Sequence, residues 1–243
     1  MKALVQITRM EAKLFFRDVS WLVSLVLPTF TLVVLYAIPA LRETSPELGG
    51  YRVVDLYVPT LIAMTLAILG VNTMPLRLSG YRERGVLRRL STTPVHPANV
   101  LAGQLIVNVA AAALSVAVLA LVGSVAFGIP GPRHPLAFLV AFGLGTCAVL
   151  AVGMLVSAVA PTSRAGQAIA LPLFFAVMFL SGVYFPRWLL PEVVQRVGEY
   201  TPPGVQAMLD AWLGAGPDAG QLAMMAIITV VAGLAATRLF RWE

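Results

Sequence analysis

The feature that most constrains this chain is a series of long apolar stretches from which charged side chains are almost absent. A helix needs about 20 mostly apolar residues to cross the hydrocarbon core of a bilayer. Charged residues make up 12% of the chain, whereas a soluble domain carries about 25%. We therefore predict an all-α integral membrane protein with six transmembrane helices in a single domain, 1–243. The predicted spans are 19–41, 55–76, 99–127, 136–160, 167–185 and 218–238.

The distribution of basic residues predicts the orientation. With six spans both termini share one side of the membrane, and that side carries most of the 17 lysines and arginines. Basic residues gather on the cytoplasmic side, so we expect both termini in the cytoplasm. The stretch 19–41 is longer than a signal-peptide core, so we expect a retained helix. The composition, rich in Ala, Val, Gly and Arg with only two lysines, is typical of a GC-rich bacterial genome. We expect the protein in the plasma (inner) membrane of a bacterium.

The segment 1–17 has the pattern of an interfacial helix. One stripe of a helix over 2–17 is basic and an adjacent stripe is apolar, which suits a helix lying between lipid headgroups and acyl chains. The alternative is a basic tail that only sets the topology. The basic stripe consists of Lys2, Arg9, Lys13 and Arg17.

The segment 77–97 is predicted to be a cytoplasmic loop and contains the densest charge of the chain. Tyr81–Leu90 lacks proline and suits a short helix with an apolar edge, and Thr93–Pro94 ends it. Such a helix can dock into a groove on a soluble partner. The residues alone leave docking and a mere topology signal equally open. Nucleic-acid binding is disfavoured because no aromatic platform accompanies the arginines.

The outer segment, 186–217, is too long for a hairpin and too broken by prolines for one helix. Trp188, Tyr200 and Trp212 are amphipathic rings suited to headgroup depth. We predict two short re-entrant helices in the outer leaflet before the last span. An exposed loop is the alternative, and it fits the aromatic residues poorly.

The spans lack the groups that several functions need. No charged residue or histidine lies near the middle of a span, which disfavours a proton-driven carrier. One cysteine and two distant histidines predict no metal site, and no nucleophile–base pair predicts catalysis. Polar residues on spans two and three either line a substrate path or hydrogen-bond neighbouring helices. They are Asn72, Thr73, Gln104 and Asn108.

Small residues on the fourth span predict a close helix contact. They recur on one face, where they let another backbone approach. They are Ala141, Gly145, Gly153 and Ser157.

The chain carries no motif for using chemical energy. Its two lysines, Lys2 and Lys13, do not follow a glycine, so the phosphate-binding G-x-x-x-x-G-K-[ST] motif is absent from the sequence. We therefore predict that the chain is no enzyme and binds no cofactor itself. If it is a pump, its ATPase is another polypeptide.

The end of span five and the outer segment resemble a known family. The stretch LPLFFAVMFLSGVYFPRWLLPEVVQRVGEYTPPGVQAML is similar to the permease (membrane) subunits of type-2 ABC exporters, among them the daunorubicin-resistance permeases. The family often has Asn-Pro-aromatic where this chain has Thr201-Pro202-Pro203. The signature residues here are Ser181, Gly182, Phe185, Pro186, Pro191 and Pro202.

A second match is YRERGVLRRLSTTPVHP, within 79–97. In this family such a stretch forms the coupling helix that sits on the nucleotide-binding subunit, so the resemblance favours docking. It also implies that the N-terminal helix is a connecting helix braced against the ATPase. The residues that would occupy the coupling element are Glu83, Arg84, Gly85, Leu87, Arg88, Leu90, Thr93 and Pro94.

The resemblance implies a set of partners and a substrate class. Two copies of a separate ABC ATPase, with ATP and Mg²⁺, would bind a pair of permeases formed by two copies of this chain or by one copy and a related permease. The substrate would be an amphipathic small molecule, a drug or natural product, as in multidrug export and antibiotic resistance. Alternatives are export of a lipid, polysaccharide or glycolipid, and a non-transporting membrane anchor or sensor for an ATPase.

Overall fold

The computed structural model describes residues 2–86, 89 and 98–239. Within those ranges the chain folds into a bundle of α-helices with no β-strand. The N-terminal pair is α1 (Lys2–Arg17) and α2 (Ser20–Ala37), which meet at a bend of 55°. The other helices are α3 (Val53–Ala67), α4 (Met74–Glu83), α6 (Ala98–Phe127), α7 (Pro135–Val159), α8 (Ser163–Leu180), α9 (Glu192–Glu199), α10 (Val205–Trp212) and α11 (Ala219–Leu239).

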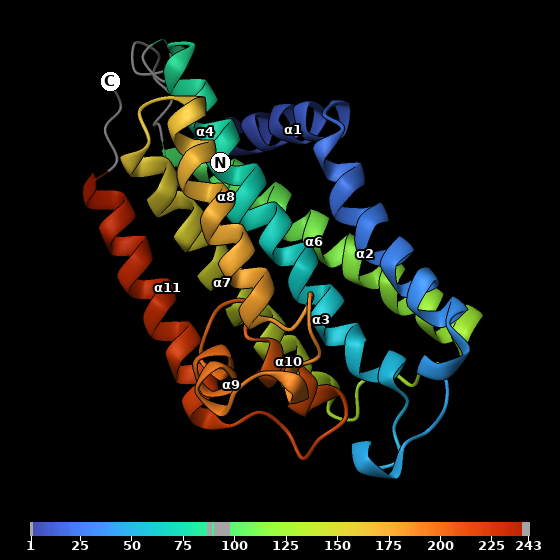
Figure 1. The fold of residues 1–243 in the computed structure, drawn as a ribbon. Coiled ribbons are helices and arrows are strands. Elements are labelled where there is room, and N and C mark those ends of the chain that lie inside the picture. Colours follow the sequence, from blue (N-terminus) through green and yellow to red (C-terminus); the bar gives the residue numbers. More distant parts are fainter. Residues whose placement is uncertain (1, 87–88, 90–97, 240–243) are drawn as a thin grey trace.

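Among the described residues, five helices are long and apolar enough to cross a membrane, and the number is six if the bent pair α1–α2 counts as one span. This agrees with the predicted all-α membrane fold. In Figure 1, α1 lies crosswise at one end of the bundle, where α4 and α11 also end. The short helices α9 and α10 lie at the opposite end, so the two ends are built differently.

The second span differs from its prediction at the end of the bundle where α1 lies. We call this end the cytoplasmic end and the opposite one the outer end, after the orientation predicted from the sequence. Helix α3 continues through a π-helical turn, η3 (Ile68–Thr73), into α4, and the combined helix runs over Val53–Glu83. The sequence predicted a loop from residue 77, yet the charged residues of α4 remain helical because partners on other helices satisfy them. Helix α4 then ends before Gly85, whose φ of +66° breaks the helix predicted over Tyr81–Leu90.

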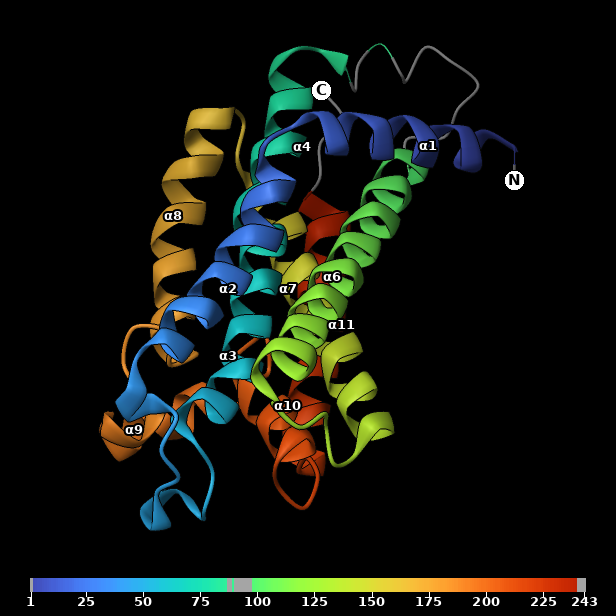
Figure 2. The same cartoon turned by 90° about the vertical axis from the view of Figure 1, so that its right-hand side faces the viewer.

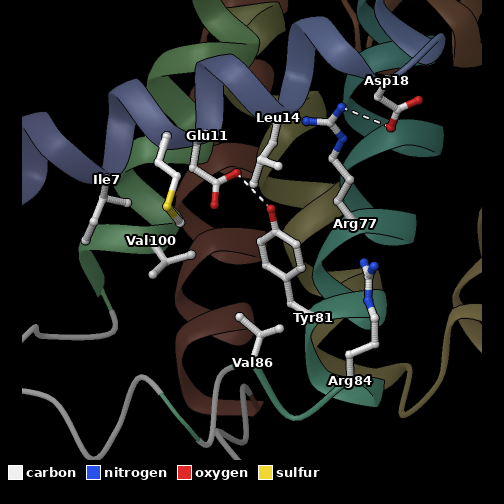
Figure 3. Close-up of a pocket in the computed structure, with 10 residues that line it drawn as sticks. Ile7, Glu11, Leu14, Asp18, Arg77, Tyr81, Arg84, Val86 and Val100 are labelled. Atoms are coloured by element: carbon white, nitrogen blue, oxygen red, sulfur yellow. Dashed lines mark hydrogen bonds and ion pairs between the residues drawn. The ribbon is translucent and has the colours of Figure 1, made fainter.

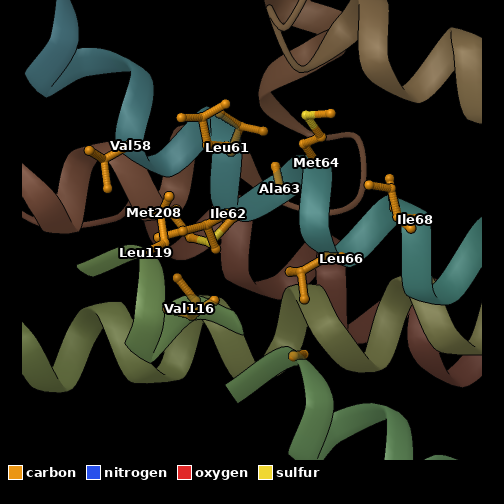
Figure 4. Packing of buried hydrophobic residues seen from close by; sticks show 14 of the residues in the cluster. Val58, Leu61, Ile62, Ala63, Met64, Leu66, Ile68, Val116, Leu119 and Met208 are labelled. Carbon is orange, nitrogen blue, oxygen red and sulfur yellow. The ribbon is translucent and has the colours of Figure 1, made fainter. Parts of the chain in front are cut away.

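Helix α3 is the centre of the bundle. Almost all of its residues are buried, because α2, α6, α7, α8 and α10 surround it. Figure 4 shows its apolar side chains packed against α6 residues such as Val116 and Leu119, and against Met208 of α10. A helix that is apolar on all faces is expected in such a position.

The predicted small-residue face of α7 is a close contact. A Cβ atom at Gly153 would collide with the carbonyl oxygen of Gly70 in the π-helical turn. A Cβ atom at Gly145 would collide with the carbonyl oxygen of Pro203, just before α10. Both glycines therefore let a neighbouring backbone touch α7 directly.

Candidate functional site

Helix α1 crosses α6 at the end of the bundle that is predicted to be cytoplasmic, as the two views in Figures 1 and 2 show. Gly103 of α6 permits the contact, since a Cβ atom there would lie 3.2 Å from Ile7 Cγ2 and 3.5 Å from the backbone of Thr8. Glu11, on the buried face of α1, is only 2% exposed. The Tyr81 hydroxyl of α4 donates a hydrogen bond of 3.1 Å to its Oε2 (Figure 3).

A second contact joins α4 to the bend between α1 and α2. Arg77 Nη2 lies 3.1 Å from Asp18 Oδ2, and the Arg77 guanidinium carbon lies 4.6 Å from the centre of the Phe15 ring. Phe15 is fully buried, so the cation–π contact is shielded from water. Together with the Tyr81–Glu11 hydrogen bond, this pair fastens α1 along the end of α4 (Figure 3).

The buried carboxyl of Glu11 has a perturbed pKa. Burial raises the pKa of Glu11 above its usual value of 4.5, while the hydrogen bond from Tyr81 and the charge of Arg77 partly offset this rise. Gln104 lies close enough to favour the charged form as well. Neither Gln104 amide atom, however, reaches hydrogen-bonding geometry with another described residue.

A cavity of about 350 Å³ opens between α1, α4 and the start of α6. Figure 3 shows Ile7, Leu14 and Val100 on its apolar side, with Glu11 and Arg84 among the polar side chains that line it. The apolar lining and the charged groups meet where α1 crosses the helix ends. The cavity is thus amphipathic and lies next to the residues predicted to couple to an ATPase.

The last turn of α4 holds the end of α7. Arg82 Nη1 donates hydrogen bonds to the carbonyl oxygens of Ser157 and Ala160, at 3.2 and 2.8 Å, and lies 3.5 Å from that of Ala158. The final carbonyl groups of a helix have no partner within the helix and carry a partial negative charge. A guanidinium is therefore well suited to this position.

The next residue holds the start of α8. Glu83 Oε2 accepts a hydrogen bond of 3.0 Å from the backbone N–H of Ser163, the first residue of α8. The Thr162 side chain caps the same helix by accepting from the Ala165 N–H at 3.2 Å. A carboxylate suits a helix N-terminus, where the N–H groups carry partial positive charge. Glu83 thus has a partner within this chain.

The other predicted coupling residues divide into two groups. Arg84 is exposed and its Nε donates to the Gly80 carbonyl oxygen at 3.0 Å, while Gly85 lies in open space just beyond the helix. The remaining members of the predicted element lie outside the described residues. They are Leu87, Arg88, Leu90, Thr93 and Pro94.

The predicted path residues occupy two places. Asn72, half-buried, and Thr73, buried, lie in the π-helical turn of the second span, a kind of turn often found at functional sites. Gln104 and Asn108 are buried on α6, where Asn108 Nδ2 donates to the Gln104 carbonyl oxygen at 2.8 Å. No hydrogen bond between described residues joins the two pairs. The side-chain amide of Gln104 and the Oδ1 atom of Asn108 also have no hydrogen-bond partner among the described residues.

The outer signature residues turn the chain after α8. Ser181 caps the C-terminus of α8, and Gly182 takes a φ of +77° that favours glycine. Pro186 and Pro191 precede η4 (Arg187–Leu189) and α9, respectively. Phe185 is exposed, and Pro202 lies in the turn between α9 and α10.

Arg187 follows this signature and holds the turn together. Its Nη2 donates to the Gln195 carbonyl oxygen at 3.2 Å. Burial lowers the pKa of Arg187, and the charges of Glu199 and Asp210 oppose that shift. The signature therefore places a half-buried cation between the outer helices.

Several residues of the cytoplasmic junction were missed by the sequence analysis. Glu11 carries a signal, because it is an acid among the bases of α1, and Thr162–Ser163 is a helix-capping pattern. Arg82 and Tyr81 carry no signal beyond the charge density of their segment. Their roles depend on contacts far away in the sequence.

Comparison with known protein families now gives the class of the protein. The sequence model of the family described as ABC-2 type transporter matches residues 2–203. The chain belongs to this family, as the outer signature and the loop pattern had indicated. No curated protein matches the chain in a sequence search.

Family membership fixes the coarse role. The chain is a multi-pass transmembrane permease component of an ABC transporter, distinct from a nucleotide-binding domain. The family implies an ABC ATPase subunit as partner.

Proposed function

We propose that this protein is the permease of an ATP-driven exporter that moves an amphipathic small molecule, a drug or natural product, out of a bacterial cell. Two copies of a separate ATPase bind beneath two permeases, formed by two copies of this chain or by this chain and a related one. The observation that carries the proposal is the tip of α4. Glu83 and Arg84 are exposed there, at the end of the bundle where α1 lies crosswise (Figure 1).

The ATPase docks on the loop that follows α4, within 79–97. The loop has positive charge for orientation and an apolar edge that a purely orienting loop does not need. Helix α1, tied to α4 through Glu11 and Arg77, adds a second surface at the same end. Both termini are cytoplasmic in this arrangement, in the inner membrane.

The test is co-purification of the permease with its cognate ATPase. A Leu87→Asp, Arg88→Glu double variant should lose the ATPase by about tenfold or more, which corresponds to about 1.4 kcal/mol of binding free energy. Arg238→Glu is the matched control, since it reverses a charge on the same side of the membrane, at the end of α11. It should retain the ATPase, and all three proteins should insert equally.

Equal ATPase binding by the double variant would contradict docking at the loop and leave it as a topology signal. Failure of the wild type to bind would contradict the exporter function itself.

The substrate path runs beside α6. The buried Gln104 amide and the Asn108 Oδ1 atom have no hydrogen-bond partner among the described residues, so they can recognise the polar part of a compound. Asn108→Leu and Asn72→Leu should change which compounds stimulate ATP hydrolysis, measured with a panel of amphipathic dyes and of lipids. An unchanged profile would favour a structural role for both residues. Stimulation by lipids alone would favour the lipid-export alternative.

A further inference from the structure

The turn between α7 and α8, residues 160–162, is held from two sides by consecutive residues of α4. Arg82 binds the carbonyl groups that end α7, with a hydrogen bond of 2.8 Å to Ala160. Glu83 binds the N–H that begins α8, at 3.0 Å from Ser163. Each charge has the sign that the adjacent helix end favours. We call Arg82, Glu83 and this turn the α4 clasp.

The helices behind the clasp also touch closely. A Cβ atom at Gly80 would lie 3.4 Å from Ser163 Oγ, and a Cβ atom at Gly166 would lie 2.9 Å from Ser79 Oγ. Ser79 is fully buried in this contact. The Arg84 side chain also lies against Gly80, with Nη2 3.3 Å from the Cβ position. Helix α4 therefore meets α8 closely at Gly80 and Gly166, so a displacement of one helix end presses on the other.

The clasp lies immediately before the loop that, in the proposed function, receives the ATPase. The covalent chain after Glu83 passes through Arg84 and Gly85, where the helix has ended. A push on that loop is therefore transmitted along the chain directly to Arg82 and Glu83. Their hydrogen bonds join the second span to the end of the fourth span, α7, and to the start of the fifth span, α8.

We infer that Arg82 and Glu83 are positioning residues that carry the movement of the ATPase-docking loop into α7 and α8. This rests on the proposed function. The carboxylate of Glu83 is already engaged by Ser163, so docking through Glu83 itself would require this bond to break. In the arrangement inferred here, the second, fourth and fifth spans move together at the cytoplasmic end. The third span is joined to them only through the loop and through its own packing.

The test measures the movement of α8 without the need for a known substrate. Spin labels at Phe30→Cys on α2 and Phe175→Cys on α8, both exposed positions, report the distance between the helices in a Cys147→Ala background. Labelled permease is diluted with unlabelled permease and reconstituted with its ATPase in lipid nanodiscs. The distance distribution is recorded without nucleotide and with ATP plus vanadate.

We expect a nucleotide-dependent shift in the otherwise unchanged protein and its loss in Glu83→Ala and Arg82→Ala. Glu83→Gln and Arg82→Lys keep an acceptor and a donor, respectively, and should restore most of the shift. Arg238→Ala is the control for a lost charge on the same side. All variants should still bind the ATPase, because a merely unfolded junction would lose binding as well as movement.

Three outcomes would overturn the inference. The shift could persist in both alanine variants, or α8 could remain still in the wild type while the ATPase is bound and active. Glu83→Ala could also release the ATPase, which would make Glu83 a docking contact. Absence of ATPase binding in the wild type is a different result, because it overturns the proposed function together with the inference.

A cross-link gives an independent measurement. Gly80→Cys and Ser163→Cys should form a disulfide, since a Cβ atom at Gly80 lies 3.4 Å from the position of the Ser163 oxygen. If α4 and α8 move as one unit, the disulfide should form equally with and without ATP plus vanadate, and the nucleotide-dependent α2–α8 distance shift should survive it. A yield that falls with nucleotide, or a cross-link that abolishes the shift, would show that the clasp opens and would contradict the inference.

Discussion

The two ends of this bundle are held together in different ways. At the cytoplasmic end, side chains reach from one helix to another, as in Tyr81 to Glu11 and Arg77 to Asp18. At the outer end, side-chain contacts such as Trp212 to Pro130 are joined by backbone hydrogen bonds between segments far apart in the sequence. The N–H groups of Arg133 and His134 donate to the carbonyl oxygens of Trp212 and Ala211, both at 3.0 Å.

This difference in contacts indicates which end of the bundle can move. A side-chain hydrogen bond contributes about 1 kcal/mol and an exposed ion pair about 0–1 kcal/mol, so each cytoplasmic contact can be broken and remade. The outer contacts depend on shape. They include a large buried ring at Trp212 and a glycine, Gly145, that meets a backbone carbonyl. We therefore expect substitutions at the outer end to destabilise the protein, and substitutions at the cytoplasmic end to change its coupling to the ATPase.

The largest effect should follow Trp212→Ala. This ring is 3% exposed, packs edge-on against Phe138 at 5.1 Å, and donates from Nε1 to the Pro130 carbonyl oxygen at 3.0 Å. Its removal should cost about 3–5 kcal/mol, as for other buried aromatic residues. Thermal unfolding in detergent measures the loss. Trp212→Phe keeps an aromatic ring and loses the hydrogen bond, so it should retain most of the stability.

If Trp212→Ala lost only as little stability as Trp212→Phe, packing shape would not be what holds the outer end together.

The next effect should follow Gly145→Ala. An alanine normally stabilises a helix relative to glycine by about 0.5–1 kcal/mol. At Gly145 the added Cβ collides with the Pro203 carbonyl oxygen, so we expect destabilisation of about 1–3 kcal/mol instead. Gly143→Ala is the matched control on α7, because nothing lies within 4 Å of its Cβ position. It should leave the unfolding temperature unchanged or raise it.

If Gly145→Ala lowers the stability of the protein and Gly143→Ala raises it, the difference between the two ends is supported. If both substitutions leave the stability unchanged or raise it, α10 can shift away from α7. The outer end would then be as adaptable as the cytoplasmic end.

Much of this fold could be predicted from the sequence because lipid imposes a simple rule. Uncharged apolar length marks a span, and the small residues of α7 mark a close contact. The partner of Gly145 could not be predicted, since Pro203 belongs to a turn far along the chain. The continuation of the second-span helix to Glu83 could not be predicted for a similar reason. The charged stretch from Arg77 to Glu83 has the composition of a loop, and its helical form is explained only by its partners at the α1–α2 bend and at the ends of α7 and α8.

The candidate site was predicted only in part. Resemblance identified the segment around Glu83, but the bond from Ser163 to its carboxylate is visible only in three dimensions. The role of Glu11 could likewise be predicted only in part. A lone acid on a basic helix indicates something unusual, yet its burial depends on how α1 crosses α6.

The smallest effect should be the pH dependence that Glu11 contributes. Burial raises the pKa of Glu11 above 4.5, so the folded protein binds more protons than the unfolded chain between 4.5 and the raised value. Stability from this group is greatest below pH 4.5 and declines as pH rises through that window. Burial raises the pKa of Asp210 in the outer segment too, so the measurement must be a difference between variant and wild type.

Glu11→Gln should remove this dependence, because the amide does not titrate and still offers an oxygen to the Tyr81 hydroxyl. Its stability relative to wild type should therefore rise with pH through the window. Tyr81→Phe should act oppositely, since loss of its hydrogen bond lets the pKa of Glu11 rise further and extends the window upward. Thermal unfolding from pH 4 to 8 measures both. If instead Glu11→Gln destabilised the protein at every pH as strongly as Trp212→Ala, the cytoplasmic junction would be a packed core like the outer end, and the contrast between them would fail.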